Sequence, residues 1–319
     1  MKRMLITASL AAIFAGALPT QADEKPLLVV SRVPMKQDRT LLLDVFRTDQ
    51  NAVAVGARGT VFVSTDGGKD WKGQRTASTR TLTSVTAVDD KTWLAVGHGG
   101  TILRSADGGQ TWTRIDVADA GQDALLGVTA IDAKTVFAYG AFGLFLRSTD
   151  GGLTWSRQEV VEDGFDRHIT KIIPLGDALL LVGESGTLAR STDGGANWVK
   201  LDSPYEGSFF GGMRTADGNA LIFGMRGNVF RSTDSGRTWK PVETGTKVAF
   251  NGGRAFDDGM VVLAGNAGKL ALSRDNGQSF ETRSLLNRGF SGIFRRSDGE
   301  LVAVGDRGIT PVPAALLAK

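Results

Sequence analysis

The residues of this sequence best suited to chemistry are six aspartates that recur in one short phrase. The phrase is Ser-x-Asp-Gly-Gly-x-x-Trp, as in RSTDGGLTW at residues 147–155, and its serines are spaced 41, 43, 43, 41 and 41 residues apart. A carboxylate can act as a general acid or base, but six equivalent copies cannot all form one active site. In a tight turn, by contrast, the carboxylate accepts hydrogen bonds from backbone amides, the glycines allow positive φ and the aromatic residue packs as an apolar anchor. We therefore interpret these aspartates as structural: Asp66, Asp107, Asp150, Asp193, Asp234 and Asp275.

The spacing of the phrase predicts the fold. A period of 40 to 45 residues with alternating, β-branched segments is typical of propeller blades of four strands. A Gly-x-x-Gly turn precedes each phrase and occurs a seventh time at residues 305–308. We therefore expect an all-β, seven-bladed β-propeller over residues 23–319, with strands A to D in each blade. The chain ends before a fourth strand of blade seven, so we predict that residues 26–33 pair beside its third strand and close the ring, which protects the sheet edges.

Small residues recur near the start of the first strand of a blade, where seven inner strands converge and bulky side chains would collide. These residues are Ser84, Gly127, Gly212, Gly253 and Gly292. Asp44 and Lys171 depart from the pattern.

The first 22 residues predict an export signal. Lys2 and Arg3 precede an apolar stretch that ends at Leu18, and the small residues Thr20 and Ala22 flank Gln21 at a cleavage site. We expect a periplasmic or secreted protein, without a lipid-anchored cysteine because the chain has none. No later segment is apolar enough to insert into a membrane.

Composition excludes several function classes. Loss of Lys2 and Arg3 leaves 35 basic side chains against 34 acidic ones, so no global basic field favours nucleic acid. With no cysteine and 2 histidines, the chain lacks the residues for a disulfide framework, a thiolate nucleophile or a multi-histidine metal site. We expect a monomer with no cofactor and no metal.

Similar aspartate phrases, called Asp boxes, also occur in sialidases and other glycoside hydrolases. Sialidases use a Tyr nucleophile with a Glu partner and arginines that hold the substrate carboxylate. Here Arg32 lies in the predicted closing strand, Tyr139 occupies a strand position typical of the core, and Tyr205 is the loop tyrosine. A sialidase-like glycoside hydrolase and a carbohydrate-binding module remain the alternatives.

The Asp boxes, the Gly-x-x-Gly-Thr turns, the seven blades and the signal peptide together resemble the photosystem II stability/assembly factor family. The resemblance covers nearly the whole mature chain. It implies a non-enzymatic propeller that binds a reaction-centre subunit precursor through an arginine-rich surface and supports assembly of a membrane complex. It also implies that relatives in bacteria without photosystems are exported partners of membrane proteins, including RND-type transporters. This sequence resembles such a relative.

Four arginines immediately precede the box serine in consecutive blades: Arg104, Arg147, Arg190 and Arg231. They have two interpretations. Each long side chain covers neighbouring apolar surface, or together they form the arginine stripe that the resemblance implies.

The B–C turns and the D–A connections of a four-stranded blade emerge on the same side of the disc, and loops of this kind often carry function. Exposed arginine and aromatic residues are typical of protein interfaces. The alternative is a solvated rim with partly buried aromatic residues. The candidate partner-binding residues are Arg58, His98, Phe142, Arg167, Tyr205, Phe210, Arg226, Arg288, Phe290 and Arg307.

Overall fold

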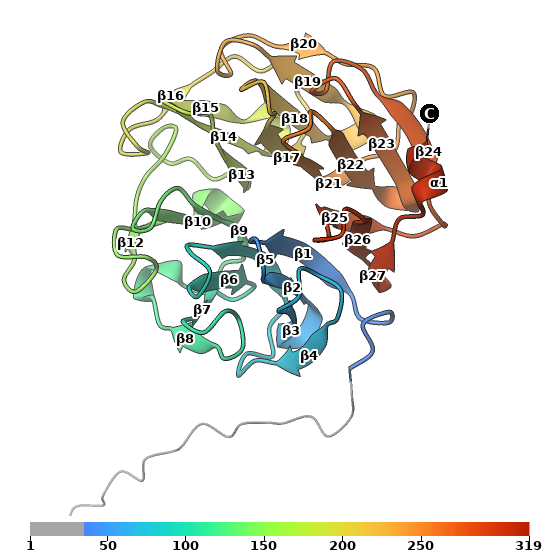
Figure 1. The fold of residues 1–319 in the computed structure, drawn as a ribbon. Coiled ribbons are helices and arrows are strands. Elements are labelled where there is room, and N and C mark those ends of the chain that lie inside the picture. Colours follow the sequence, from blue (N-terminus) through green and yellow to red (C-terminus); the bar gives the residue numbers. More distant parts are fainter. Residues whose placement is uncertain (1–34, 319) are drawn as a thin grey trace, which may run out of the picture.

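Seven antiparallel sheets stand around a central axis in the computed structural model, which describes residues 35–318 (Figure 1). Six sheets have four strands in chain order from the axis to the rim, and the seventh has three described strands. The seven-bladed propeller predicted from the repeat is confirmed. The predicted closing strand, residues 26–33, lies outside the described residues.

The first strand of each blade lines the axis: β1 (Leu42–Arg47), β5 (Leu82–Ala87), β9 (Leu125–Ala130), β13 (Ile169–Pro174), β17 (Phe209–Arg214), β21 (Phe250–Ala255) and β25 (Phe290–Arg295). The second strands are β2 (Ala52–Gly56), β6 (Trp93–Gly97), β10 (Val136–Gly140), β14 (Leu179–Gly183), β18 (Ala220–Gly224), β22 (Val261–Gly265) and β26 (Leu301–Gly305). The third are β3 (Thr60–Ser64), β7 (Thr101–Ser105), β11 (Phe145–Ser148), β15 (Leu188–Ser191), β19 (Val229–Ser232), β23 (Lys269–Ser273) and β27 (Gly308–Pro311). The fourth are β4 (Lys72–Arg75), β8 (Thr113–Ile115), β12 (Ser156–Arg157), β16 (Val199–Lys200), β20 (Lys240–Pro241) and β24 (Glu281–Ser284).

Short helical turns connect these strands. Five of them form B–C turns: η1 (Ala57–Gly59), η3 (Ala141–Gly143), η4 (Glu184–Gly186), η5 (Met225–Gly227) and η6 (Asn266–Gly268). The turn η2 (Ala118–Ala120) follows blade 2, and α1 (Ala314–Leu317) follows β27. Within the described part of the chain, no helix has the length and apolar character needed to cross a membrane.

The hydrophobic core lies between blades. Every residue of each second strand is buried, because both faces of that strand pack against neighbouring blades. The apolar clusters join adjacent blades, and one of them joins Val45 of blade 1 to Phe294 of blade 7. A continuous ring of such clusters makes each blade depend on its two neighbours.

A bulge in the first strand joins each blade to the next at the channel. The register shifts after the first residue of each inner strand, as between Leu42 and Asp44. In four blades the bulged side chain donates a hydrogen bond to the next blade: Thr83 to the Leu125 oxygen, Thr170 to the Phe209 oxygen, Asn251 to the Phe290 oxygen and Ser291 to the Leu42 oxygen, at 2.6 to 3.0 Å. The Ser291 bond crosses from blade 7 to blade 1 and joins the two ends of the ring.

The register also corrects the positions of the small inner residues. Asp44, Ser84, Gly127 and Lys171 each follow the bulge and align with Gly211, Gly252 and Gly292. The expected Gly212 and Gly253 lie one residue further along, because each is the second glycine of a pair whose first member takes the aligned position. Asp44 and Lys171 are thus the charged exceptions to a ring of small residues.

Candidate functional site

The six Asp boxes share one hydrogen-bonded geometry at the C–D turns. In each, the buried serine hydroxyl donates to the aspartate Oδ1 at 2.6 to 2.8 Å. The same hydroxyl accepts a hydrogen bond from the amide of the glycine two residues after the aspartate, at 2.8 to 2.9 Å; Ser235 and Asn276 replace the preceding glycine in blades 5 and 6. The aspartate Oδ1 also accepts the amide four residues further on, at 2.8 to 3.0 Å. Each carboxylate is thus engaged by its own turn.

The glycine two residues after the aspartate of each box packs against the preceding blade. At Gly195, with φ of +83°, an added Cβ would lie 2.4 Å from the Phe137 ring of blade 3. At Gly277 it would lie 2.4 Å from Leu221 of blade 5. Glycine is needed here both for the left-handed backbone and for the contact between blades.

These contacts determine the acidity of the box aspartates. Burial raises the pKa of Asp150, but hydrogen bonds from Thr154 and Ser148 outweigh it and lower that pKa to about 2. Hydrogen bonds from Asn197 and Ser191 lower the pKa of Asp193. A general acid at neutral pH needs the opposite shift. The Asp-box geometry therefore suits turn formation and not proton transfer.

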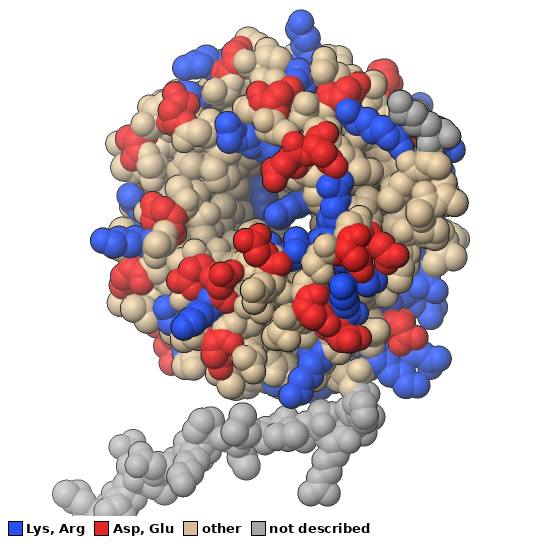
Figure 2. Space-filling view, in the orientation of Figure 1, with Lys and Arg blue, Asp and Glu red and all other residues tan. Residues whose placement is uncertain are grey.

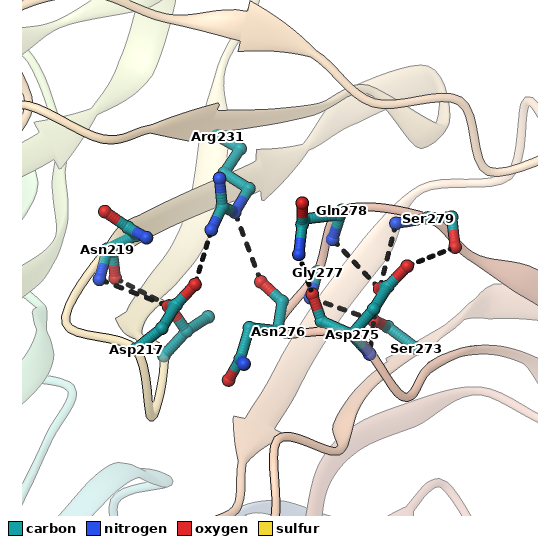
Figure 3. Close-up of polar contacts among 10 residues, drawn as sticks. Asp217, Asn219, Arg231, Ser273, Asp275, Asn276, Gly277, Gln278 and Ser279 are labelled. Atoms are coloured by element: carbon teal, nitrogen blue, oxygen red, sulfur yellow. Dashed lines mark hydrogen bonds and ion pairs between the residues drawn. The ribbon is translucent and has the colours of Figure 1, made fainter.

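The arginines that precede the box serines reach toward the Asp box of the next blade. Arg104 Nε donates to the Gly151 oxygen at 3.2 Å, Arg190 Nε to the Ser235 oxygen at 3.1 Å and Arg231 Nε to the Asn276 oxygen at 3.3 Å. Arg231 also pairs with Asp217 at 2.6 Å (Figure 3). We call these contacts the arginine latches.

Arg147 is the exception among the four. Its Nε has no hydrogen-bond partner among the described residues, and its guanidinium lies 5.9 Å from the centre of the Phe137 ring. The geometry of the set fits the structural interpretation, with specific hydrogen bonds added to the covering of apolar surface.

The opposite ends of the third strands carry the B–C turns, and the D–A connections lie beside them. The Thr76 amide, after β4, donates to the Gly59 oxygen at 2.9 Å, and the Gly143 amide donates to the Arg167 oxygen at 2.9 Å. We call this side of the disc the B–C face. It is the side on which the sequence placed the candidate partner-binding residues.

Five B–C turns hold an exposed non-glycine residue in the left-handed conformation. The residues are Arg58, Phe142, Ser185, Arg226 and Ala267, with φ of 51° to 56°. Such a conformation costs an L-residue about 1 kcal/mol, and strained backbone often marks a functional surface. The backbone of these tips is therefore alike while their side chains differ.

The candidate residues fall into three groups by exposure. The exposed group is Arg58, His98, Phe142, Arg167, Phe210, Arg226 and Arg307. Arg288 and Tyr205 are half-buried, and the Tyr205 ring packs 6.2 Å from both Phe209 and Phe230.

Phe290 does not belong to the binding face. Its side chain is 1% exposed, and it starts β25 in the core between blades. Phe290 aligns with Leu42 and Phe209, the buried first residues of other inner strands. The assignment of this phenylalanine to a partner surface is wrong.

The B–C face also carries apolar residues that the sequence analysis did not select. Leu41, Met225 and Leu286 are 41%, 37% and 54% exposed, beside Phe142 at 58% and Phe210 at 36%. Leu286 has φ of 56° in the connection between blades 6 and 7. Met225 and Leu286 could have been found from the sequence, because alignment of the repeats places both in turns, where large apolar residues are expected to be exposed.

His168 has a partner that sequence reasoning did not find. Its Nδ1 lies 3.2 Å from Glu184 Oε2, at ion-pair distance but without hydrogen-bond geometry, and the Phe142 ring packs edge-on at 5.2 Å. Glu184 belongs to the η4 turn of the same blade. The three side chains form one contact between blades 3 and 4 on the B–C face.

The other residues considered for catalysis have structural surroundings. Tyr139 is fully buried, and its hydroxyl lies 2.8 Å from Thr129 Oγ1. Arg32 lies outside the described residues. Within residues 35–318, no group of three or more histidine, aspartate or glutamate side chains is arranged to hold a metal ion.

Comparison with known proteins places this geometry in a family. None of the curated proteins matches the sequence significantly. A solved structure titled "YCF48 bound to D1 peptide" superposes with a TM-score of 0.70 at 19% identity, over 91% of this chain and 95% of that one. YCF48 from Cyanidioschyzon merolae superposes with a TM-score of 0.68 at 17% identity, over 88% and 97% of the two chains.

A protein outside this group has the same fold. The WD40 β-propeller domain of Doa1 superposes with a TM-score of 0.67 at 13% identity, over 88% of this chain and 94% of that one. Structural likeness at such identities therefore shows the propeller fold alone. The sequence profile described as "Photosynthesis system II assembly factor YCF48" is more specific, and it matches residues 27–136 and 119–309. Because these matches span most of the sequence, the chain belongs to the YCF48 family of photosystem II assembly factors.

Proposed function

We propose that the protein is an exported, non-enzymatic scaffold that binds an extracytoplasmic segment of a membrane protein and supports assembly or stability of a membrane complex. Residues 1–22 direct export in this proposal, and the mature chain acts in the periplasm or outside the cell. RND-type transporters are the partner class to which the resemblance points. The family membership and the B–C face support this function.

The observation that carries the proposal is the concentration of exposed apolar side chains on the B–C face. Of the seven large apolar residues exposed in the described part of the chain, five lie on this face, and the other two are Leu153 and Val199. Apolar side chains gathered on one surface are typical of binding sites. Leu41, Phe142, Phe210, Met225 and Leu286 thus give the B–C face a character that the rest of the surface lacks.

The charges of the B–C face indicate the chemistry of the partner. Arg58, Arg167, Arg226 and Arg307 make no ion pair with any residue of 35–318. Arginines without a carboxylate partner are available to pair across an interface. We therefore propose a partner segment that combines acidic and apolar side chains. The related structure of YCF48 holds a D1 peptide, which supports peptide recognition by this fold.

The test uses a variant that removes exposed apolar side chains and in which relief of backbone strain offsets the lost contact between Phe142 and His168. Phe142 and Leu286 are both exposed and both left-handed, so Phe142→Gly with Leu286→Gly removes two apolar contacts and relieves two strained conformations. Leu153→Gly is the control, since Leu153 is 53% exposed on an Asp box at the other end of the blades. The measurement is in-cell crosslinking of the tagged protein, followed by mass spectrometry and melting curves of each variant.

We expect the wild type and the Leu153 variant to capture the same membrane protein. The double variant should lose at least 90% of that capture while it melts no lower than the wild type. Equal capture by the double variant would remove the B–C face from the proposal. If no membrane protein is captured above background, the scaffold function fails and glycosides become the next substrates to test.

A further inference from the structure

The central channel is a second, separate surface. The first strands enclose a cavity of about 500 Å³, open to solvent, which is the size of many small-molecule sites. Its charged lining residues are three basic side chains, Lys171, Arg214 and Arg254, and one acidic side chain, Asp44. In Figure 2, basic side chains lie inside the central opening and acidic ones surround its rim. The cavity is therefore electropositive within an acidic rim.

Arg254 is the residue that distinguishes this channel. It belongs to β21 of blade 6, and its guanidinium lies 5.2 Å from the centre of the Phe46 ring on β1 of blade 1. The Phe46 ring in turn packs edge-on against buried Trp93 at 6.0 Å. Contact with a ring face holds the guanidinium while its in-plane N–H groups stay available to other acceptors.

No described residue uses those donors. Among residues 35–318, the Arg254 side chain makes neither a hydrogen bond nor an ion pair. Burial lowers the pKa of Arg254, as does the charge of Arg47, whereas the charges of Asp44 and Asp257 raise it. The guanidinium nitrogens reach the solvent of the open channel, so they can donate hydrogen bonds to an acceptor that enters it.

Asp44 is not that partner, because its carboxylate is already used. Its Oδ2 accepts the Ser84 hydroxyl at 2.7 Å and the Val85 amide at 3.0 Å, and its Oδ1 accepts the Val45 amide at 2.8 Å. These bonds join blade 1 to blade 2. Asp44 therefore acts on Arg254 through its charge alone and without a hydrogen bond, and the lining keeps three basic side chains against one acidic one.

Lys171 adds a second free cation to the same cavity. It stands in β13 of blade 4 at the position of Gly211 and Gly252, and it has no ion pair within the described chain. Guanidinium and ammonium groups that face one partly enclosed cavity form a site for the oxygens of phosphate or carboxylate. We propose that the central channel binds a small oxyanion, a phosphate or carboxylate carried by a small molecule, through Arg254 and Lys171.

The experiment measures oxyanion binding directly. Isothermal titration calorimetry and melting curves are run with inorganic phosphate and with citrate, and sodium chloride keeps the ionic strength constant. At a concentration tenfold above Kd, a ligand that binds only the folded state favours it by a factor of about 11. We expect the melting temperature to rise by a few degrees with at least one of the two probes.

Three variants locate the site. Arg254→Met and Lys171→Met remove a charge but keep a long apolar side chain, and Arg157→Met is the control on exposed β12 of the outer rim. We expect Arg254→Met to weaken binding at least tenfold, Lys171→Met to weaken it several-fold and the control to bind as the wild type does. If Arg254→Met does not fold, Lys171→Met decides the question.

Two results would overturn the proposal. One is a wild-type response to both probes no greater than the response to chloride. The other is unchanged affinity in Lys171→Met or in folded Arg254→Met, which would place the anion elsewhere. Neither result bears on partner capture by the B–C face, so this proposal and the scaffold proposal can fail independently.

Discussion

The two ends of the third strands differ in how much their side chains vary from blade to blade. At the Asp-box end, the serine, aspartate and glycine make the same hydrogen bonds in six blades, and the side chains are engaged within the fold. At the B–C end, the backbone is alike but the tip residue is arginine, phenylalanine, serine or alanine. The constant side chains of the Asp boxes stabilise the ring of blades. The varied side chains of the B–C turns, on a similar backbone, form a surface that can recognise a particular partner.

The largest expected effect concerns the second glycine of an Asp box. Gly195→Ala would place a Cβ 2.4 Å from Phe137 at φ of +83°, whereas Gly194→Ala, at φ of +69°, meets nothing within 4 Å. We expect Gly195→Ala to lower the free energy of unfolding by about 3 kcal/mol or more, and Gly194→Ala by about 1 kcal/mol. Urea denaturation followed by tryptophan fluorescence measures both.

The pair separates backbone strain from packing between blades. Since both glycines have positive φ, strain alone predicts similar losses for the two variants. Equal urea midpoints would therefore show that the contact between Gly195 and blade 3 contributes nothing, and the Asp box would be only a turn.

The next effect tests the arginine latches. Arg231→Met removes the bond to the Asn276 oxygen and the pair with Asp217, whose side chains are 13% and 31% exposed. We expect a loss of about 2 kcal/mol, because a partly buried charged hydrogen bond is lost and Asp217 keeps its charge. Arg147→Met, which has no Nε hydrogen bond to lose, should cost under about 1 kcal/mol. Thermal unfolding of both variants makes the comparison.

The outcome also decides between the two interpretations of these arginines. If both variants fold like the wild type but lose partner capture, the four arginines are a binding stripe and the latches are incidental. Lower stability of Arg231→Met with normal capture is the result that the geometry favours.

Acid unfolding probes the box carboxylates. Hydrogen bonds hold the pKa of Asp150 at about 2, below the ordinary value of 3.8, so this part of the stability is complete above about pH 4 and is lost as the pH falls toward 2. In that interval the unfolded chain binds more protons, and stability rises with pH. Asp150→Asn should lower the free energy of unfolding at pH 7 by about 1 kcal/mol, after allowance for solvent screening, and flatten its dependence between pH 4 and pH 2.

Denaturant unfolding at a series of pH values gives both quantities. A variant with the wild-type slope would mean that the Asp150 charge does not stabilise its turn.

Much of this fold could be predicted from the sequence, because the Gly-x-x-Gly turn of the repeat occurs seven times, once in each blade. The Asp box is local, so its serine, aspartate and glycine can be interpreted from their spacing, and the period counts the blades. Alignment of the repeats could also have predicted that Phe290 is buried, because it aligns with Leu42 and Phe209 at the first position of an inner strand. The error came from treating two adjacent positions at the strand start as equally exposed.

Adjacent residues at the start of an inner strand differ in exposure because their side chains point to opposite sides. In residues 209–210, two phenylalanines are neighbours in sequence, yet Phe209 is fully buried and Phe210 is 36% exposed. Alternation with a period of two turns their side chains to opposite sides of the strand, and it fails only at the next step, because the register shifts between Phe209 and Gly211. Contacts across the channel, such as Arg254 on Phe46, join residues about two hundred positions apart and leave no local pattern.

The smallest expected effect is a gain in stability at the Asp box of blade 1, where the residue before the aromatic anchor is an aspartate. In five boxes the residue before the aromatic anchor donates a side-chain hydrogen bond to the aspartate Oδ2 at 2.5 to 2.7 Å. Blade 1 has Asp70 at this position, a second carboxylate beside Asp66. Asp70→Thr replaces a like charge with a donor and should raise the free energy of unfolding by about 0.5 to 1 kcal/mol. Asp163→Thr, in an exposed loop, controls for the change in net charge. An equal gain in both variants would assign the effect to net charge. A gain at Asp70 alone would show that the hydrogen bonds of the Asp box determine which residue is favoured before the aromatic anchor.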